Sequence, residues 1–243
     1  MMRRLALLAV VVLSCTRERT SVIVGPPLTI ARVEVDAGAA PHAPVTATFV
    51  DLTRASAPVT ARMCELVVVS VVSGWAKALG EDLGVGDALV VGASGKAKRF
   101  DLVGEGVALL AAVEPVGKSC PSEGHRVARA AKPLIFANGT MRAFLDGEGV
   151  STDVYVGRLE GTASVPEHVH PGAWEILGAV EASGAFTVEG ETKRLRPRQI
   201  VVVAPGTRHS WQPDQDSSLR AVQMYVPPGS EQRFRVLAQV RAN

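Results

Sequence analysis

Three histidines and one glutamate lie in two short stretches of this sequence, and their side chains are of the kinds that bind metals. His168, His170 and Glu175 fall within one segment, and His209 follows a Pro-Gly turn further along the chain. Imidazole and carboxylate groups are the usual ligands of divalent transition metals. The set suits Zn, Mn, Cu, Fe or Ni and does not choose among them. We therefore expect one divalent transition metal at these four residues.

The spacing of the four residues allows them to meet. His168 and His170 are separated by one residue, so on a strand both point to the same face. Glu175 opens an apolar run that predicts the next strand, and the apolar run 200–204 predicts the strand before the turn that carries His209. Taken singly, each feature has an ordinary explanation, because His-x-His is common in exposed strands. In a barrel, however, these strands would bring all four side chains to one point.

The segment from Gly161 to Trp211 resembles a cupin domain, a small double-sheet barrel of the jelly-roll type. The first motif of that family is Gly, His-x-His, three or four residues, Glu and a later Gly, here Gly184. The second is a Pro/Gly turn followed by His. The chain departs from the pattern at Ala182 and Arg198, where the family often has Gly. The resemblance implies that His and Glu at the motif positions hold the metal.

An internal repeat predicts a second barrel. Residues 65–74 line up with 175–184, because in both a Glu leads an apolar strand that closes with Ser-Gly. In this alignment Pro58, Thr60 and Ala97 stand opposite the three histidines, so only the glutamate remains as a ligand. The first copy should therefore bind no metal and serve as a packing partner, a dimerisation surface or a degenerate binding pocket.

These patterns predict an all-β chain of two tandem cupin-type double-stranded β-helix (jelly-roll) barrels after an N-terminal signal segment. The degenerate barrel would span 27–130 and the metal-binding barrel 131–243. The composition agrees, because 23 glycines and 15 prolines supply the turns of a many-stranded protein. Two barrels in one chain can imitate a cupin dimer, so we expect a monomer or a homodimer.

The N-terminus has the pattern of an export signal. Basic residues precede the apolar run 5–13, which is too short to span a bilayer. Residues 12–15 resemble a bacterial lipobox, in which Cys15 would be acylated after removal of the signal peptide 1–14, and 15–26 would form a tether. The residue after Cys15 is not the Asp associated with inner-membrane retention, which favours the outer membrane, facing the periplasm or the cell surface. Plain secretion and an uncleaved anchor are the alternatives.

Cys64 and Cys120 are the two other cysteines of the chain. Two spare cysteines in an exported protein predict a disulfide, because the compartment is oxidising. Two buried, inert thiols are the alternative.

The surroundings of the ligands predict a pocket without naming a substrate. Aromatic and polar side chains on the flanking strands are candidates to line it, and alternation places two of them on one strand face. The candidate pocket residues are Trp174, Phe186, Trp211, Gln223 and Tyr225.

The function is less determined than the fold. A net charge of +2 with interspersed signs, and no basic stripe, argues against a nucleic-acid partner. Cupins include dioxygenases, isomerases, decarboxylases, sugar binders and storage proteins, so the fold does not select an activity. We expect a small-molecule metalloenzyme of a dioxygenase-like or isomerase-like kind. A non-catalytic small-molecule or sugar-binding cupin and a structural bicupin are the alternatives, and the sequence does not decide whether the protein is an enzyme.

Overall fold

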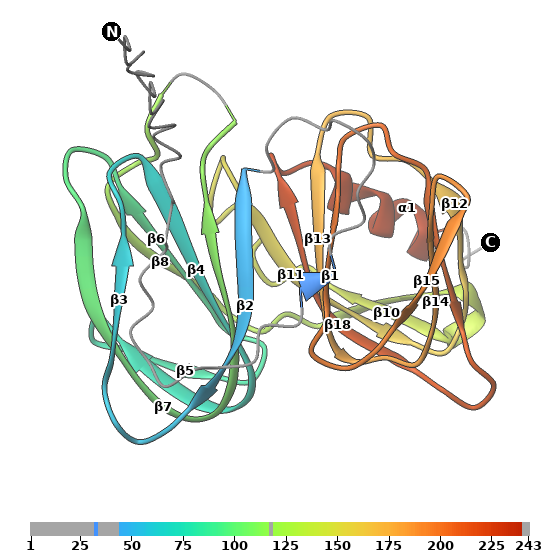
Figure 1. Cartoon of the computed structure of the whole chain (residues 1–243), viewed down its shortest axis with the longest axis horizontal. Helices are drawn as coiled ribbons and strands as arrows, with labels where there is room; N and C mark the ends of the chain where they lie inside the picture. Colours follow the sequence, from blue (N-terminus) through green and yellow to red (C-terminus); the bar gives the residue numbers. More distant parts are fainter. Residues whose placement is uncertain (1–31, 34–43, 117–118, 240–243) are drawn as a thin grey trace, which may run out of the picture.

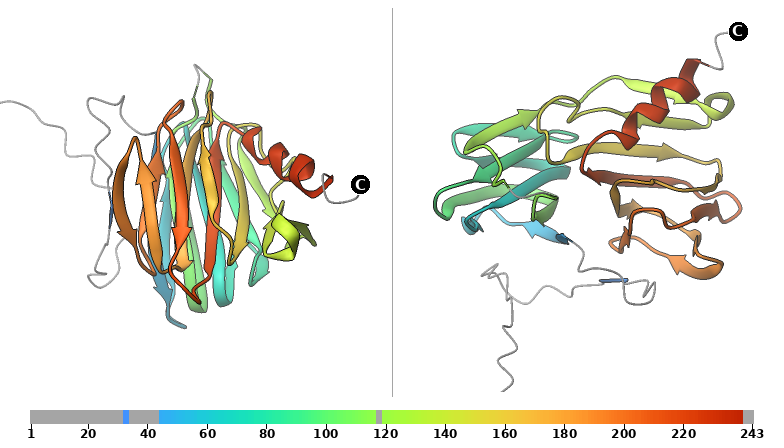
Figure 2. Two further views of the ribbon diagram at one scale, coloured as in Figure 1. Left: turned by 90° about the vertical axis from the view of Figure 1, so that its right-hand side faces the viewer. Right: turned by 90° about the horizontal axis from the view of Figure 1, so that it is seen from above.

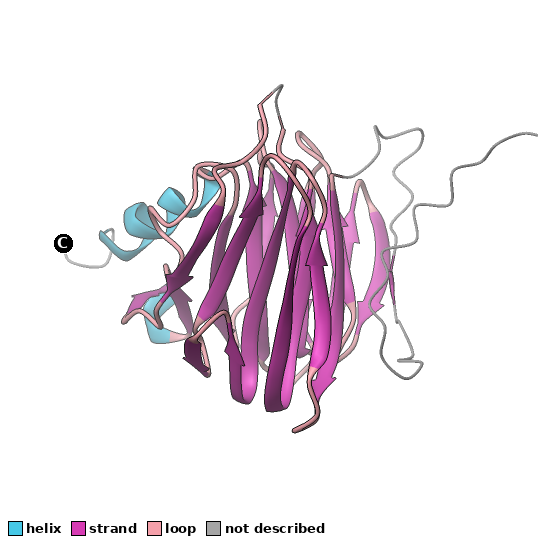
Figure 3. Cartoon of the chain, turned by 90° about the vertical axis from the view of Figure 1, so that its left-hand side faces the viewer, coloured by secondary structure: helices cyan, strands magenta, loops and turns pink. Residues whose placement is uncertain are grey.

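The computed structural model of the protein describes residues 32–33, 44–116 and 119–239. Strands make up most of this part of the chain, and the helices lie together on one side (Figure 3). Figure 1 shows two barrels side by side, which confirms the predicted all-β fold with tandem cupin-type barrels. The predicted signal peptide and tether lie outside the described residues. No helix in the described part is long and apolar enough to cross a membrane.

The first barrel is built around two long strands. Its sheet has the order β2-β7-β4-β6-β8. β7 pairs with β2 through its second half and with β3 through its first half, so one strand serves two sides of the barrel. The strands are β2 (Val45–Leu52), β3 (Ala57–Ala61), β4 (Glu65–Ala78), β5 (Glu81–Gly84), β6 (Ala88–Ala93), β7 (Lys98–Val113) and β8 (Gly124–Ala128).

The second barrel consists of a large and a small sheet. The large sheet has the order β1-β16-β13-β18-β11-β10-β9, and the small sheet β12-β17-β14-β15. The elements are β9 (Pro133–Phe136), η1 (Ala137–Gly139), β10 (Met141–Phe144), β11 (Tyr155–Gly161), β12 (Val165–His168), β13 (Trp174–Glu181), β14 (Gly184–Val188), β15 (Glu191–Leu195), β16 (Ile200–Val203), β17 (His209–Pro213), β18 (Leu219–Val226), η2 (Ser230–Gln232) and α1 (Arg233–Gln239).

The predicted boundary between residues 130 and 131 falls between the last strand of the first barrel, which ends at Ala128, and β9, which begins at Pro133. The short strand β1 (Arg32–Val33) precedes the first barrel in the chain but pairs in parallel with β16 of the second barrel.

The two barrels pack face to face through a shared apolar core. Along β4, Val67 and Val69 belong to the core inside the first barrel, whereas Leu66 and Val68 belong to a cluster that also contains Ile176 of β13. Both faces of each central strand are therefore buried. This explains why these strands read as continuous apolar runs rather than as alternating patterns. Figure 2 shows the two barrels in contact from above.

One partly buried carboxylate supports the segment through which the chain leaves the first barrel. The Asp87 carboxylate accepts hydrogen bonds from the backbone N–H of Gly84 at 3.0 Å and of Ala130 at 2.9 Å. It also accepts one from the Arg129 guanidinium at 3.0 Å. Burial opposes ionisation of Asp87, but these donors outweigh it and lower its pKa. Asp87 therefore ties the turn between β5 and β6 to the segment that leaves the first barrel.

Arg198 occupies a turn in the left-handed region of backbone conformation, with φ of 65°. Its N–H donates to the carbonyl oxygen of Ala179 at 2.7 Å, and its guanidinium pairs with Asp51 of the first barrel. A residue other than glycine is strained in this conformation. Glycine adopts this conformation without strain, which explains why the family motif usually has glycine at this position.

Cys64 and Cys120 form a disulfide, with 56 residues of sequence separation between them. The bond joins the residue before β4 to the segment that leads into β8. It closes a loop that contains most of the first barrel.

Candidate metal centre

The structure brings the four predicted ligands together inside the second barrel. His168 ends β12 and lies directly across from His209, the first residue of β17. His170 follows in the loop after β12, and Glu175 is the second residue of β13. One ligand atom from each of the four residues lies within 4.8 Å of the others.

The imidazole rings are oriented so that their Nε2 atoms face one another. The Nδ1 of His168 lies 2.8 Å from the carbonyl oxygen of Pro166, and the Nδ1 of His209 lies 3.0 Å from that of Thr207. Because a carbonyl oxygen only accepts, each Nδ1 carries a proton, and Nε2 is the nitrogen that faces the other residues of the cluster. The Nε2 of His168 is buried without a hydrogen-bond partner, whereas the Nε2 of His209 lies 2.7 Å from the Glu175 carboxylate. A buried nitrogen without a partner, beside a second imidazole and a carboxylate, fits a metal ion.

Glu175 is the centre of the cluster. Its Oε2 lies 3.1 Å from the Nε2 of His170 and 2.7 Å from the Nε2 of His209. Its Oε1 accepts a hydrogen bond from the amide of Gln223 and a longer one, at 3.5 Å, from the hydroxyl of Tyr225. Burial opposes the charged form of Glu175, yet the imidazole contacts hold its pKa well below the usual range. The site thus offers an ionised, oriented carboxylate.

The surroundings of His168 and His209 shift their pKa values in opposite directions. Burial, aided by the positive charge of Arg233, lowers the pKa of His168 to about 4. His209 is also buried, but its contact with the Glu175 carboxylate outweighs the burial and raises its pKa. His168 is therefore neutral at physiological pH, which is the state that binds a metal.

The sequence of this region matches a known family. Residues 155–226 match the family model described as the cupin domain. The matched segment lies within the second barrel, from the start of β11 to the end of β18. Among curated proteins, no sequence match was found.

Solved structures share the fold of the chain at low identity. A variant of oxalate decarboxylase from Bacillus subtilis has a TM-score of 0.57 and 12% identity over 76% of this chain and 69% of its own. AerE from Microcystis aeruginosa has a TM-score of 0.56 and 11% identity, over 75% and 86%. Vicilin from hazelnut, Corylus avellana, has a TM-score of 0.51 and 12% identity, over 74% and 80%. These similarities show a common fold and do not assign an activity.

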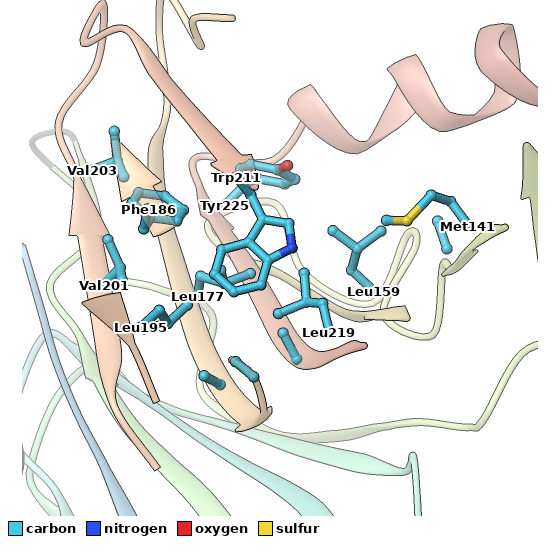
Figure 4. Packing of buried hydrophobic residues seen from close by; sticks show 14 of the residues in the cluster. Met141, Leu159, Leu177, Phe186, Leu195, Val201, Val203, Trp211, Leu219 and Tyr225 are labelled. Atoms are coloured by element: carbon cyan, nitrogen blue, oxygen red, sulfur yellow. The ribbon is translucent and has the colours of Figure 1, made fainter. Parts of the chain in front are cut away.

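The predicted pocket residues of the second barrel separate into two groups. Gln223 and Tyr225 of β18 contact Glu175, as alternation along that strand predicts. The ring of Phe186 lies 6.0 Å from that of His209. Figure 4 shows Phe186, Trp211 and Tyr225 in the apolar cluster inside the barrel, where Phe186 and Trp211 pair across β14 and β17.

Trp174 does not line the pocket, and the expectation for it was wrong. It precedes Glu175 on β13, so its side chain points to the opposite face of the sheet. It belongs to the apolar cluster that includes residues of both barrels. Trp174 is adjacent to a ligand in the sequence, but its side chain lies between the two barrels.

Sequence reasoning also missed Arg233, the first residue of α1. Its guanidinium Nη1 lies 3.2 Å from the Nε2 of His170, and its Nη2 donates to the hydroxyl of Tyr225 at 3.0 Å. Arg233 belongs to neither family motif and lies beyond the last strand. No local pattern in the sequence indicates that the chain returns to the site at this residue.

The equivalent place in the first barrel holds apolar side chains. In the first barrel Val59 of β3 lies directly across from Phe100 of β7. Val59, Phe100 and Ala61 are all buried in the core of that barrel. Pro58 and Thr60, which the sequence alignment placed opposite two of the histidines, alternate along β3 with the buried Val59 and Ala61, and Ala97 is exposed.

The glutamate that the first barrel retains is already paired. Glu65 is buried, and its carboxylate accepts hydrogen bonds from the Arg62 backbone N–H at 2.8 Å and guanidinium at 2.9 Å. A permanent cation of the chain thus neutralises this carboxylate, which lacks imidazole neighbours of the kind found around Glu175.

Proposed function

We propose that this protein is a metal-dependent cupin that acts on a small organic molecule. The observation that carries the proposal is the convergence of three imidazoles and one ionised carboxylate on one buried point, where the Nε2 of His168 has no hydrogen-bond partner. Four protein ligands leave two positions of an octahedral ion for water or a substrate.

A divalent metal bound here would polarise a substrate oxygen or lower the pKa of a bound water. The chain supplies the positioning. Gln223 and Tyr225 hold the carboxylate of Glu175, and backbone carbonyls fix the tautomers of two histidines. Rigid ligands around an ion with open positions suit dioxygenase-like or isomerase-like chemistry, which we propose as the activity.

A non-catalytic binding protein is the second candidate, and Tyr225 is the observation that favours it. Burial, aided by the charge of Glu175, raises the pKa of Tyr225 well above its usual range. The hydroxyl therefore stays protonated and serves as a hydrogen-bond donor rather than as a base. A site with a metal and a donor but no base near neutral pH is sufficient to hold a small molecule or a sugar.

We further propose that the protein is exported and anchored to the outer membrane through an acylated Cys15. The lipobox-like residues 12–15 and the Cys64–Cys120 disulfide support this, because disulfides persist in oxidising compartments. The test is fractionation of cells that produce the Cys15→Ser variant. Release of the variant from the membrane fraction supports the anchor, and an unchanged distribution contradicts it.

The first test of the function is the metal content of the purified protein by inductively coupled plasma mass spectrometry. The parent protein should hold about one equivalent of a single metal, and a His168→Ala/His209→Ala variant should hold none above background. Equal metal content in both would refute the site.

Substrate screening then separates the two candidate functions with the single variant His168→Ala. Loss of turnover supports an enzyme, and loss of ligand affinity alone supports a binding protein. Loss of thermal stability alone would mean that the metal only holds the barrel together.

A further inference from the structure

Helix α1 holds Arg233 beside the metal centre. The helix follows β18 through the turn η2 and packs against β9. Phe234 anchors it, because this side chain is buried and its ring lies 5.7 Å from the ring of Phe136. The left view of Figure 2 shows α1 along one edge of the second barrel. The buried anchor at Phe234 limits how far the preceding residue can move.

The guanidinium of Arg233 is engaged with the ligand set itself. Nη1 lies 3.2 Å from the Nε2 of His170, and Nη2 lies 3.0 Å from the hydroxyl of Tyr225, which in turn contacts Glu175. Its Nε is buried without a hydrogen-bond partner. The side chain therefore has donor capacity that the protein does not use.

The described residues provide no carboxylate within ion-pair distance of Arg233. By contrast Arg235, two residues later in the helix, pairs with Glu148. The buried Glu231 of η2 accepts hydrogen bonds from its own turn and from the adjacent glutamine. A half-buried guanidinium beside three imidazoles, without an anion of its own, is unfavourable unless another group supplies the negative charge.

Metal binding would increase this imbalance. The ion brings two positive charges, and Glu175 is the one carboxylate among the four ligands. Coordination also uses the lone pair of His170 Nε2, the atom that Arg233 Nη1 now contacts. The N–H of Nη1 then needs a new acceptor. The loaded site would combine excess positive charge with free guanidinium donors next to the metal.

The geometry points to Arg233 as the residue that recognises an anionic ligand of the metal centre, and we infer that this ligand is a small carboxylate. The inference rests on the metal-dependent function proposed above and specifies its substrate class. A guanidinium matches a carboxylate in charge and in its paired donors. A phosphate dianion would need a second cation, and among the described residues Arg233 is the one permanent cation that contacts the ligand set.

The test uses cobalt(II) as the probe metal, because its visible absorption changes when an inner ligand changes. Acetate, acetamide and inorganic phosphate are titrated into the cobalt-loaded parent protein. The same titrations are made on Arg233→Gln, Arg233→Lys and, as the matched control on the same helix, Arg235→Gln. Cobalt affinity is measured separately for each protein, and circular dichroism checks that each is folded.

We expect acetate to bind the parent protein and to bind Arg233→Gln at least about tenfold more weakly, since a hydrogen bond to a charged partner is lost. Arg233→Lys should recover part of the affinity, Arg235→Gln should equal the parent, and cobalt affinity should stay unchanged. Equal acetate affinity in the parent and Arg233→Gln overturns the inference, as does acetamide binding as tightly as acetate.

Two further outcomes are diagnostic. Tighter binding of phosphate than of acetate, with the same dependence on Arg233, overturns the carboxylate assignment. Failure of cobalt to bind the parent protein at all overturns the proposed function, and this inference with it. Cobalt binding without any Arg233-dependent anion binding refutes only the inference.

Discussion

Replacement of Glu175 by glutamine tests whether this carboxylate is a metal ligand or only a buried polar anchor. In the metal-free protein the change removes hydrogen bonds to a charged group, worth about 1.5–3 kcal/mol. It also removes a buried carboxylate whose desolvation costs several kcal/mol. These terms oppose each other, so the free energy of unfolding of the metal-free protein should change by less than about 2 kcal/mol.

The metal-loaded protein should respond much more strongly. With an effective dielectric of about 20, a divalent ion and a carboxylate about 4 Å apart attract each other by about 8 kcal/mol. Even half of this lowers the affinity about a thousandfold. At a metal concentration 100 times the parent Kd, binding stabilises the parent by about 2.7 kcal/mol, which raises its Tm by about 5–11 °C. Glu175→Gln should shift by less than about 1 °C at the same concentration.

The assay is thermal denaturation with and without metal, followed by circular dichroism. Glu65→Gln is the matched control, because Glu65 is also a buried glutamate that opens a central strand but is paired with Arg62. The control should keep the full metal-induced rise in Tm. If Glu175→Gln keeps it as well, Glu175 is not a ligand. If Glu65→Gln loses it, the metal binds in the first barrel and the assignment of the two barrels is wrong.

Three further changes probe the scaffold. At Arg198, with φ of 65°, glycine should be more stable than alanine by about 1 kcal/mol in urea denaturation, because both lose the ion pair with Asp51 but only glycine relieves the backbone. Asp87→Ala should destabilise by about 2–4 kcal/mol at pH 7. The lowered pKa of Asp87 means that its contribution is present above the unfolded pKa and is lost as the pH falls below about 4, so urea denaturation of both proteins should converge there. A Cys64→Ser/Cys120→Ser variant should lose about 4 kcal/mol of unfolding free energy in the same assay, since the bond closes a loop of 56 residues.

Each of these expectations has a result that contradicts it. Equal stability of the glycine and alanine variants would mean that the backbone at Arg198 is not strained. A constant difference between Asp87→Ala and the parent protein down to pH 3 would remove the carboxylate from the explanation. Unchanged stability of the serine variant under non-reducing conditions would show that the disulfide does not constrain the unfolded chain.

Much of the metal centre was predictable because it depends on local spacing. The alternating spacing of His168 and His170 predicted that both would point to one side, although β12 ends at His168 and His170 lies in the loop that leads to Glu175. The family motifs add His209 in the same way. The repeat of Glu65–Gly74 at 175–184 likewise predicts two similar barrels, since it depends on matched spacing in the sequence alone.

Tertiary structure decided what local spacing cannot express. Alternation gives Trp174 and Glu175 opposite faces, but only the packing of two barrels shows that both faces are buried. In the first barrel the buried positions of β3 are Val59 and Ala61 rather than the neighbouring Pro58 and Thr60, because successive residues of a strand face opposite sides.

The sequence by itself therefore determined the kinds of ligand, their spacing and the strand pattern that carries them. The tertiary structure decided which charges meet. Arg233 reaches His170 because Phe234 anchors α1 against the second barrel, and Arg62 neutralises Glu65 within a turn. The contact between Arg233 and His170 joins side chains far apart in the chain, and it depends on how a helix packs, which no local pattern of residues encodes.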